Sequence, residues 1–178
     1  MEIPEIKTSR LILRPFKKED VDPLHQILQE EDILRYFPNP SPPSRERVER
    51  LISNQLRHWE EHHLGWWALE PRFKKQLIGW CGLQFLPDTE ETEVGFLLSK
   101  AFWRQGLTTE AAKASLAYGF ENLGLKCIVG IAHPENIGSQ RVLEKLGMSL
   151  TVKTRYFGMD CYRYSIEGSN WNRIAKPQ

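Results

Sequence analysis

The chain has 178 residues and a mass of 20.8 kDa, with 24 Lys and Arg residues against 23 Asp and Glu residues. This length predicts a single domain over residues 1–178, and the net charge of +1 lacks the basic excess of a nucleic-acid binder. Three widely spaced cysteines, without partners at ligand spacing, predict neither a disulfide framework nor a zinc site. No targeting or membrane-spanning segment is evident. We therefore expect a cytoplasmic protein without a metal, nucleic-acid or membrane partner.

Strand and helix patterns alternate along the first half of the chain. Residues 11–16 form an apolar run typical of a strand, and residues 17–37 place apolar side chains near helical spacing, with Pro23 as an early interruption. A proline-rich turn precedes a second helix pattern, in which one side is lined by Val48, Leu51, Ile52, Leu56 and Trp59. The apolar segments 64–70 and 76–86 flank a short polar stretch with a proline, which predicts a hairpin.

The same alternation continues in the second half of the chain. Residues 92–99 form an apolar strand, in which Gly95 predicts a bulge or a close backbone approach. The later elements are expected in this order: a helix from Thr108 to a cap at Gly124, a strand at 127–132, a helix from Asn136 to Gly147, and a hairpin of residues 151–157 and 161–167 around Gly158. Together these elements predict an α/β fold, a mixed sheet with helices packed on it.

A short polar stretch, WRQGLTTEA at residues 103–111, runs from a strand end into a helix start. The first turn of a helix presents backbone N–H groups without intrahelical acceptors at the positive end of the helix dipole, so such a turn binds phosphate. Gly106 would let the backbone approach an anion closely, whereas Glu110 would compete with that anion if its side chain pointed inward. The alternative is a plain turn in which a threonine caps the helix. The chain contains neither GxxxxGK[ST] nor GxGxxG.

Three segments carry a resemblance to a known family: RLILRPFKKED from Arg10, EVGFLLSKAFWRQGLTTEA from Glu93, and HPENIGSQRVLEKLGM from His133. They resemble the GNAT N-acetyltransferases, in particular the branch similar to the RimJ and RimL ribosomal-protein N-terminal acetyltransferases, from about Arg10 to about Glu167. The resemblance implies the GNAT acyl-CoA N-acyltransferase fold and acetyl-CoA as cosubstrate, in a monomer or a homodimer.

The same resemblance implies transfer of the acetyl group to a primary amine, with a protein or peptide N-terminal α-amine as the expected acceptor. The fold alone does not decide the acceptor. Two alternatives stay open. One is a small amine, such as a polyamine, an amino acid or a drug, and the other is a CoA-binding module without turnover.

The resemblance also assigns a cofactor loop, which reads W-G-K-G-Y-A-T-E-A in the branch and W-R-Q-G-L-T-T-E-A here. Arg104 stands where the branch prefers Gly, and Thr108 where it prefers Gly or Ala, so both side chains narrow the loop. We interpret Arg104 as an additional charge partner for pyrophosphate and Thr108 as a residue like an N-cap; either would weaken CoA binding if it pointed inward. The implied cofactor-binding residues are Phe96, Leu97, Leu98, Arg104, Gln105, Gly106, Leu107, Thr108, Thr109 and Asn136.

Acetyl transfer from a thioester to an amine needs a neutral amine, a polarised carbonyl and a proton for the departing thiolate. By resemblance, the strand 94–98 splays from its neighbour and offers free backbone groups near Phe96 and Leu98 to the pantetheine and the thioester oxygen. Glu93 would take the amine proton through a water; the alternative is an exposed strand carboxylate. Ser139 stands where the RimL-like branch carries its serine and would protonate the thiolate; the alternative is a capping residue.

Aromatic residues add further expectations. Tyr36 and Phe37 are interpreted as walls of the acceptor site or as core residues. His133, at a strand end, is expected to be structural or to face solvent; the alternative is that it approaches the cofactor. The tryptophans of the predicted hairpin are expected in the core, with one of them as a possible groove residue: Trp66, Trp67 and Trp80.

Overall fold

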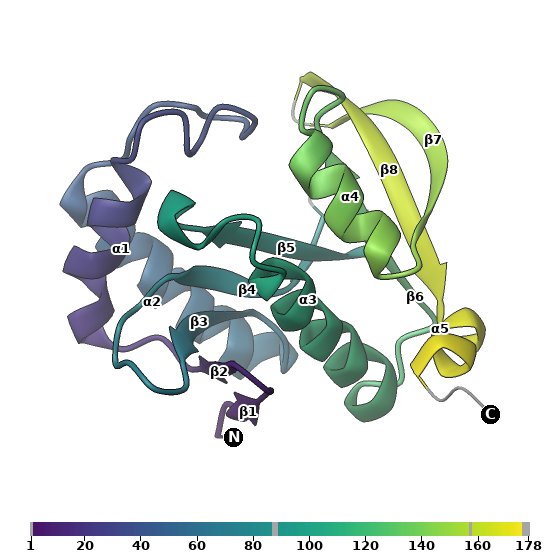
Figure 1. Cartoon of the computed structure of the whole chain (residues 1–178), viewed down its shortest axis with the longest axis horizontal. Helices are drawn as coiled ribbons and strands as arrows, with labels where there is room; N and C mark the ends of the chain where they lie inside the picture. Colours follow the sequence, from purple (N-terminus) through teal and green to yellow (C-terminus); the bar gives the residue numbers. More distant parts are fainter. Residues whose placement is uncertain (1, 87–88, 157, 176–178) are drawn as a thin grey trace.

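The computed structural model describes residues 2–86, 89–156 and 158–175. In these ranges the strands form one eight-stranded sheet, in the order β1-β2-β3-β4-β5-β6-β8-β7 (Figure 1), which confirms the predicted mixed α/β fold. The strands are β1 (Ile6–Lys7), β2 (Leu11–Arg14), β3 (Trp66–Pro71), β4 (Gly79–Phe85), β5 (Thr92–Leu98), β6 (Cys127–Ala132), β7 (Ser149–Tyr156) and β8 (Met159–Glu167). The helices are η1 (Lys18–Asp20), α1 (Val21–Leu28), α2 (Arg45–His62), η2 (Lys100–Phe102), α3 (Leu107–Ala117), η3 (Tyr118–Asn122), α4 (Ile137–Lys145) and α5 (Gly168–Ala175).

The sheet divides between β5 and β6. β1 to β5 pair antiparallel with their neighbours, as do β6, β8 and β7. In contrast, β5 and β6 run parallel, and the one described pair between them joins Glu93 to Val129. The strands therefore diverge beyond Glu93, as predicted. The β4–β5 ladder continues without a register shift along the whole strand, so the bulge expected at Gly95 is wrong for this ladder.

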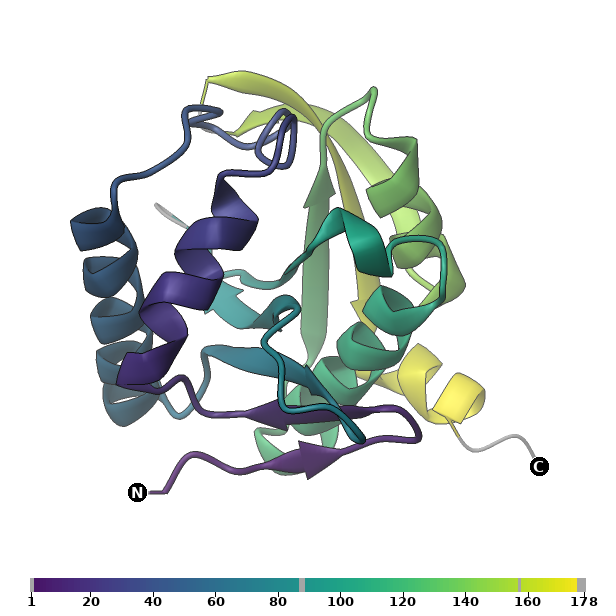
Figure 2. The ribbon, with the colours of Figure 1, turned by 60° about the vertical axis from the view of Figure 1, so that its left-hand side comes forward.

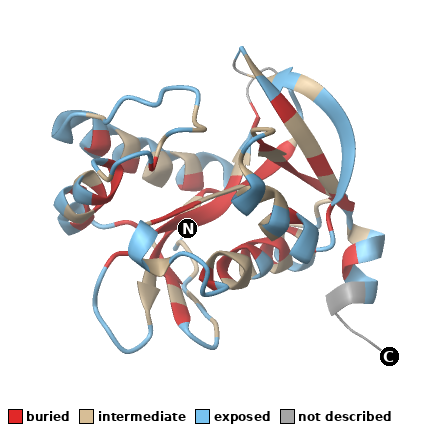
Figure 3. Ribbon diagram, turned by 45° about the horizontal axis from the view of Figure 1, so that its top comes forward, coloured by how far each residue is buried: buried red, intermediate tan, exposed pale blue. Residues whose placement is uncertain are grey.

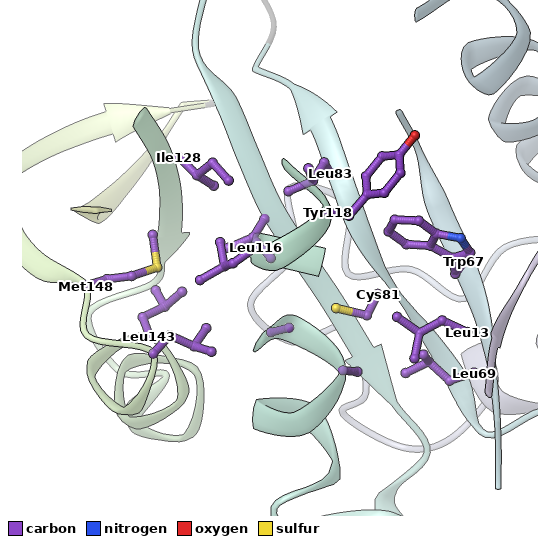
Figure 4. Close-up of a cluster of buried hydrophobic side chains, with 14 of the residues drawn as sticks. Leu13, Trp67, Leu69, Cys81, Leu83, Leu116, Tyr118, Ile128, Leu143 and Met148 are labelled. Carbon is purple, nitrogen blue, oxygen red and sulfur yellow. The ribbon is translucent and has the colours of Figure 1, made fainter. Parts of the chain in front are cut away.

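Helices cover both faces of the sheet (Figure 2). α1 and α2 pack on one face, where they help to bury Trp80 and Leu97. α3 and α4 lie on the other face, over a core cluster that includes Cys81, Leu116 and Leu143 (Figure 4). The central strands are largely buried between these layers, whereas the outer strand β7 is largely exposed (Figure 3). Side chains that alternate along β5 consequently enter two different cores.

The first predicted helix is shorter than its apolar pattern. α1 ends at Leu28, and turns follow, with Asp32 in the left-handed region at φ 58°. Ile33 is still buried against α1 and α2, which explains why the apolar spacing continues beyond the helix end. Pro23 does not interrupt α1, because it occupies the third helical position, where a backbone N–H has no intrahelical acceptor.

The helix after the polar stretch begins earlier than predicted. Its N-cap is Gly106, in the left-handed region at φ 76°, so neither Thr108 nor Thr109 is the cap. The helix passes from α3 into the π-helical turn η3, and Gly124 follows its end at φ 66°, in the predicted capping position. Glycine tolerates such positive φ values without steric cost, which is why these two positions mark the helix ends.

The remaining predicted elements are confirmed with small shifts at their ends. The first strand stops at Arg14, before Pro15, and the last hairpin turns at Gly158, with Phe157 outside the described residues. β1 and α5 have no counterpart among the predicted elements. In the described ranges no helix has the length and apolar character needed to cross a membrane.

Candidate active site

A cleft opens where β5 and β6 diverge. It has a volume of ≈ 420 Å³ and lies between β5, the start of α3 and the start of α4. The predicted cofactor residues that line it are Phe96, Leu97, Leu98, Arg104, Thr108 and Asn136. The Leu98 carbonyl, expected to be free, accepts a hydrogen bond from the Trp103 indole N–H at 2.7 Å. We call this space the cofactor cleft, because it follows the edge of β5 that β6 leaves unpaired.

The loop before α3 presents a row of backbone donors. Arg104 and Gly106 both adopt left-handed conformations, at φ 60° and 76°. From Arg104 to Thr109, no backbone N–H donates a hydrogen bond to a described residue, and Glu110 is the first to donate, to the Gly106 carbonyl. Successive N–H groups in such a loop form a concave nest for an anion. The local backbone thus has the form expected of a phosphate site.

Four of the predicted cofactor residues do not line the cofactor cleft: Gln105, Gly106, Leu107 and Thr109. The Gln105 side chain turns back and donates to the Ala101 carbonyl at 3.0 Å. Leu107 is buried in the core. Any cofactor contact from these positions would therefore come from the backbone, and their role stays a prediction.

Arg10, just before β2, holds this loop in place. Its Nε donates to the Glu110 carboxylate at 2.7 Å, and its Nη1 donates to the Gln105 carbonyl at 2.8 Å. The Thr8 hydroxyl also donates to Glu110, at 2.6 Å. Glu110 therefore does not line the cleft, and the competing inward orientation is wrong. Burial opposes the charge of Glu110, but the bonds from Thr8 and Arg10 outweigh it and lower its pKa.

Sequence reasoning missed this role of Arg10. The partners lie about a hundred residues away along the chain, and no local pattern around Arg10 indicates them. The acidic first turn of α3 was visible, yet an acidic residue in that position is common because it complements the helix dipole. Only the packing of β2 against the start of α3 brings the two charges together.

A second cavity, of ≈ 220 Å³, continues from the cofactor cleft on the α1–α2 side of the sheet. Both cavities are lined by Tyr36, Phe37, Phe96, Asn136 and Ser139. The walls farther from the cleft include Trp66 and Trp80 on the sheet and Met159 on β8. Trp67, by contrast, is buried in the core on the opposite face. We call this second space the acceptor cavity.

Glu93 supplies a carboxylate to the acceptor cavity. Its side chain accepts a hydrogen bond from the Gln84 amide at 2.8 Å, and also one from the backbone N–H of Ile131. Burial raises the pKa of Glu93 to about 7, against the lowering effect of these two bonds. Only 8% of the residue is exposed, so the interpretation as an exposed strand carboxylate is wrong. A carboxylate with this pKa takes up and releases a proton near neutral pH, as a general base requires.

Ser139 lies where the two cavities meet. It is the third residue of α4, whose cap is Asn136: the Asn136 side-chain oxygen accepts from the Ser139 backbone N–H at 3.1 Å. The helix start predicted at Asn136 is confirmed, with Asn136 as the cap, and the alternative that the Ser139 side chain caps the helix is wrong. The Ser139 hydroxyl makes no hydrogen bond to another described residue, so it is available to a ligand.

Aromatic rings enclose the acceptor cavity on the side of the α1–α2 turn. Tyr36 stacks on His133, with ring centroids 5.1 Å apart, and Phe37 packs edge-on against Trp80. Tyr36 and Phe37 thus form walls of the cavity, in agreement with their interpretation as acceptor-site residues. His133 also lines the cavity. Its Nδ1 accepts from the Glu135 backbone N–H at 3.1 Å, so the neutral ring carries its proton on Nε2.

A larger groove, of ≈ 690 Å³, lies beside α1. Its central cation, Arg14, donates to Asp20 and Glu70 from all three guanidinium nitrogens, at 2.8–2.9 Å. The Arg14 guanidinium is thus fully paired within the chain. The groove is therefore a weaker candidate for chemistry than the two joined cavities, despite its size.

Known proteins share this arrangement. A family model described as an acetyltransferase (GNAT) domain matches residues 10–149. The uncharacterized N-acetyltransferase YoaA of Bacillus subtilis is 29% identical over 145 residues, which cover 81% of this chain and 82% of YoaA.

Solved structures extend the likeness to the fold. A GNAT-family acetyltransferase from Bacillus anthracis is 25% identical, with a TM-score of 0.81 over 93% of this chain and 99% of that chain. The RimL ribosomal-protein acetyltransferase, solved in complex with coenzyme A, is 16% identical and shares the fold, with a TM-score of 0.80 over 92% of this chain and 98% of that chain. With its splayed sheet, its donor-lined loop and its family match, the chain belongs to the GNAT family of acetyltransferases.

Proposed function

We propose that this protein transfers the acetyl group of acetyl-CoA to a primary amine, and that the acceptor is a protein or peptide N-terminal α-amine. The observation that carries the proposal is the junction of the two cavities. Ser139 lines both of them, and Glu93 lines the acceptor cavity. A thioester in the cofactor cleft and an amine in the acceptor cavity would therefore meet between a proton donor and a proton acceptor.

The cofactor cleft suits CoA by its chemistry. Backbone N–H groups from Arg104 to Thr109, together with the cationic side chain of Arg104, are suited to a pyrophosphate. The edge of β5 beyond Glu93 lacks a strand partner. Pantetheine carries amide groups, and these are suited to pair with an open strand edge in the way that an added strand does.

The reaction joins the amine nitrogen to the acetyl carbon and breaks the carbon–sulfur bond of the thioester. In its charged form Glu93 accepts the proton that the amine gives up, through a water. The Ser139 hydroxyl donates a proton to the departing thiolate and regains one from solvent, so that the products are an acetamide and the CoA thiol. Burial of Glu93 raises its pKa and so makes the carboxylate a stronger base than an exposed one.

A small amine is the second candidate acceptor. The acceptor cavity measures ≈ 220 Å³ and is walled by aromatic rings, which is small beside the roughly 300–1,000 Å³ of most ligand sites. Such a cavity holds a single residue or a compound of similar size. A CoA-binding module without turnover is disfavoured, because a buried carboxylate and an unbonded hydroxyl would serve no purpose in it.

We also propose a cytoplasmic location. Cys81, Cys127 and Cys161 are free thiols. Free thiols are typical of reducing compartments. The working form is proposed to be a monomer or a homodimer.

Release of the CoA thiol tests the activity. The protein is incubated with acetyl-CoA and a thiol-reactive dye, with peptides that have free N-termini, with the same peptides blocked at the N-terminus, and with polyamines and amino acids. We expect thiol release with free N-termini and none with the blocked peptides. Release with small amines alone would favour the second candidate.

Binding is measured in parallel by thermal unfolding. CoA at a hundredfold excess over its Kd stabilises the folded state by about 2.7 kcal/mol, and adenosine without phosphates is expected to do so far less. A rise in melting temperature with CoA, but no thiol release with any amine, would overturn the catalytic proposal and leave a binding module. Equal shifts with CoA and adenosine would overturn the phosphate nest.

A further inference from the structure

The acceptor cavity has a buried hydrogen-bond donor without an acceptor. Among the residues that the structure describes, the indole N–H of Trp66 is the one buried side-chain group without a hydrogen-bond partner. The rest of Trp66 is fixed: its backbone N–H donates to Gln55 at 3.0 Å, its carbonyl accepts from Trp59 at 3.1 Å, and its ring stacks on Trp80 at 3.7 Å. Buried donors in proteins are nearly always paired. A fixed, unpaired donor carried by a residue that lines the acceptor cavity is therefore suited to a ligand.

The Trp66 donor lies on the same side of β5 as the Glu93 carboxylate. A Cβ atom placed on Gly95 would be 3.8 Å from Trp66 Nε1 and 3.3 Å from the Trp80 ring, so both indoles lie over Gly95. Gly95 and Glu93 are two residues apart on one strand, which places them on the same face, about 7 Å from each other. Donor and carboxylate thus bracket a short stretch of the cavity.

We propose that the acceptor substrate is an α-aminoacyl group with a large apolar side chain, and that Trp66 is a specificity-determining residue that binds its carbonyl or carboxylate oxygen. This inference rests on the proposed acetyl transfer. In an α-aminoacyl group the oxygen is only three bonds from the amine nitrogen. With the nitrogen directed toward Glu93 and the intervening water, the oxygen can accept a hydrogen bond of about 2.9 Å from the Trp66 indole.

The walls of the cavity determine which acceptor side chains fit. The stacked indoles of Trp66 and Trp80, the edge-on ring of Phe37 and the thioether of Met159 offer apolar and aromatic contacts. An acidic side chain would instead face the charged form of Glu93. The volume of ≈ 220 Å³ accommodates one residue and not several. The same α-aminoacyl chemistry is present in a free amino acid, in its amide and in the first residue of a peptide.

A matched pair of substrates tests the oxygen. Phenylalaninamide and 2-phenylethylamine share the ring and the amine, but only the amide has an oxygen near the nitrogen. For the wild-type protein, kcat/KM per neutral amine is expected to be about three- to tenfold higher for phenylalaninamide, since the bond to Trp66 adds to its binding. Equal values for the two amines would overturn the proposal.

A matched pair of variants tests the donor. Trp66→Phe keeps an aromatic ring in the stack and removes the N–H. We expect the ratio of kcat/KM for phenylalaninamide to kcat/KM for 2-phenylethylamine to fall about three- to tenfold, because both substrates meet the altered ring but only the amide loses a hydrogen bond. Trp171→Phe, which removes an indole N–H that bonds Glu121 outside the cavity, should leave the ratio of the two substrates unchanged. An unchanged ratio in folded Trp66→Phe would overturn the proposal, and if that variant fails to fold, the wild-type comparison decides.

The source of the α-aminoacyl group is resolved by comparing phenylalanine, phenylalaninamide and a short peptide that begins with phenylalanine. Rapid acetylation of all three identifies the shared group, and a preference for one identifies the source. Failure of every amine to release the CoA thiol would refute the proposed function itself. Rapid acetylation of polyamines, with slow acetylation of all three phenylalanine compounds, would refute this inference and leave acetyl transfer intact.

Discussion

The cofactor cleft and the acceptor cavity are adjoining spaces, but the chain builds them in different ways. The cleft is bordered by main-chain groups: the open edge of β5 and the loop from Arg104 to Thr109, whose N–H groups we propose as phosphate donors. The cavity presents side chains: the Glu93 carboxylate, the stacked indoles and the Tyr36–His133 pair. A main-chain site depends on backbone conformation and tolerates many side chains, whereas a side-chain site changes with every substitution.

This difference explains the two departures from the family loop. Arg104 occupies a left-handed position, at φ 60°, where the branch prefers Gly. A non-glycine residue adopts that conformation at some cost, but its N–H group remains available to an anion. Thr108 likewise lines the cleft. The chain therefore keeps the form of the nest while its side chains vary.

Removal of the Glu93 carboxylate is expected to have the largest effect, because it removes the proposed base from the acceptor cavity. Glu93→Gln should lower kcat by about 10²–10⁴, with the affinity for acetyl-CoA unchanged. In the wild type, kcat/KM calculated per neutral amine should rise with pH through about 7, as Glu93 loses its proton and becomes able to accept one. This rise should disappear in Glu93→Gln and persist in His133→Gln, which alters the same cavity. A rise that persists in Glu93→Gln would assign the base to another residue.

The same variant provides a readout that does not depend on activity. Because the folded state raises the pKa of Glu93, it binds the proton more tightly than the unfolded chain does. The free energy of unfolding of the wild type should therefore fall as pH rises from the ordinary glutamate pKa to about 7, relative to Glu93→Gln. Denaturant unfolding at several pH values measures this difference. A difference that does not vary with pH would contradict the raised pKa.

Ser139→Ala tests the junction of the two regions and is expected to have the next largest effect. Loss of the proton donor should lower kcat by at least about tenfold, with little change in acetyl-CoA affinity and in melting temperature. Asn136→Ala is the structural control, because it removes the true cap of α4 and should cost about 0.5–2 kcal/mol of stability. Full turnover in Ser139→Ala would remove its hydroxyl from the mechanism and assign the proton to solvent.

Gly106→Val tests the loop before α3, whose contribution to the site is made by main-chain groups. Valine disfavours the left-handed conformation at φ 76°, so the loop must change and its donors move. The affinity for CoA should fall by about tenfold or more, which corresponds to about 1.4 kcal/mol. Gly124→Val is the matched control, with similar φ but open space around it and a position outside the cleft. Unchanged CoA affinity in a folded Gly106→Val protein would make Gly106 a turn residue only.

Arg10→Gln is expected to have the smallest effect, since it perturbs the nest indirectly. It leaves the charge of Glu110 uncompensated near the proposed anion site and frees the Gln105 carbonyl. We expect KM for acetyl-CoA to rise about two- to fivefold with kcat unchanged, the range of a charge at a helix end. Adding Glu110→Gln should restore KM in part. An equal fall in kcat, or no rescue, would reduce Arg10 to a role in stability.

Local patterns predicted most of the elements, because the contacts that define them are short in sequence. The Asn136 cap bonds a residue three positions later, and Gly124 and Gly158 adopt the positive φ values expected where a helix or strand ends. The errors have non-local causes. α1 stops at Leu28 while Ile33 stays buried because tertiary packing, and not helical periodicity, covers Ile33.

The sequence by itself determined the family and the loop, since motif residues and helix-end signals lie close together along the chain. Only the tertiary structure decided the state of the site. Glu93 lies between β4 and β6, whose residues Gln84 and Ile131 donate hydrogen bonds to its carboxylate. Its burial between these strands raises its pKa. The Trp66 donor lacks a partner because α2 and the sheet fix the ring over Gly95, and Glu110 leaves the cleft because Arg10 approaches from β2. Burial and charge pairing depend on contacts between distant segments, and local sequence does not contain them.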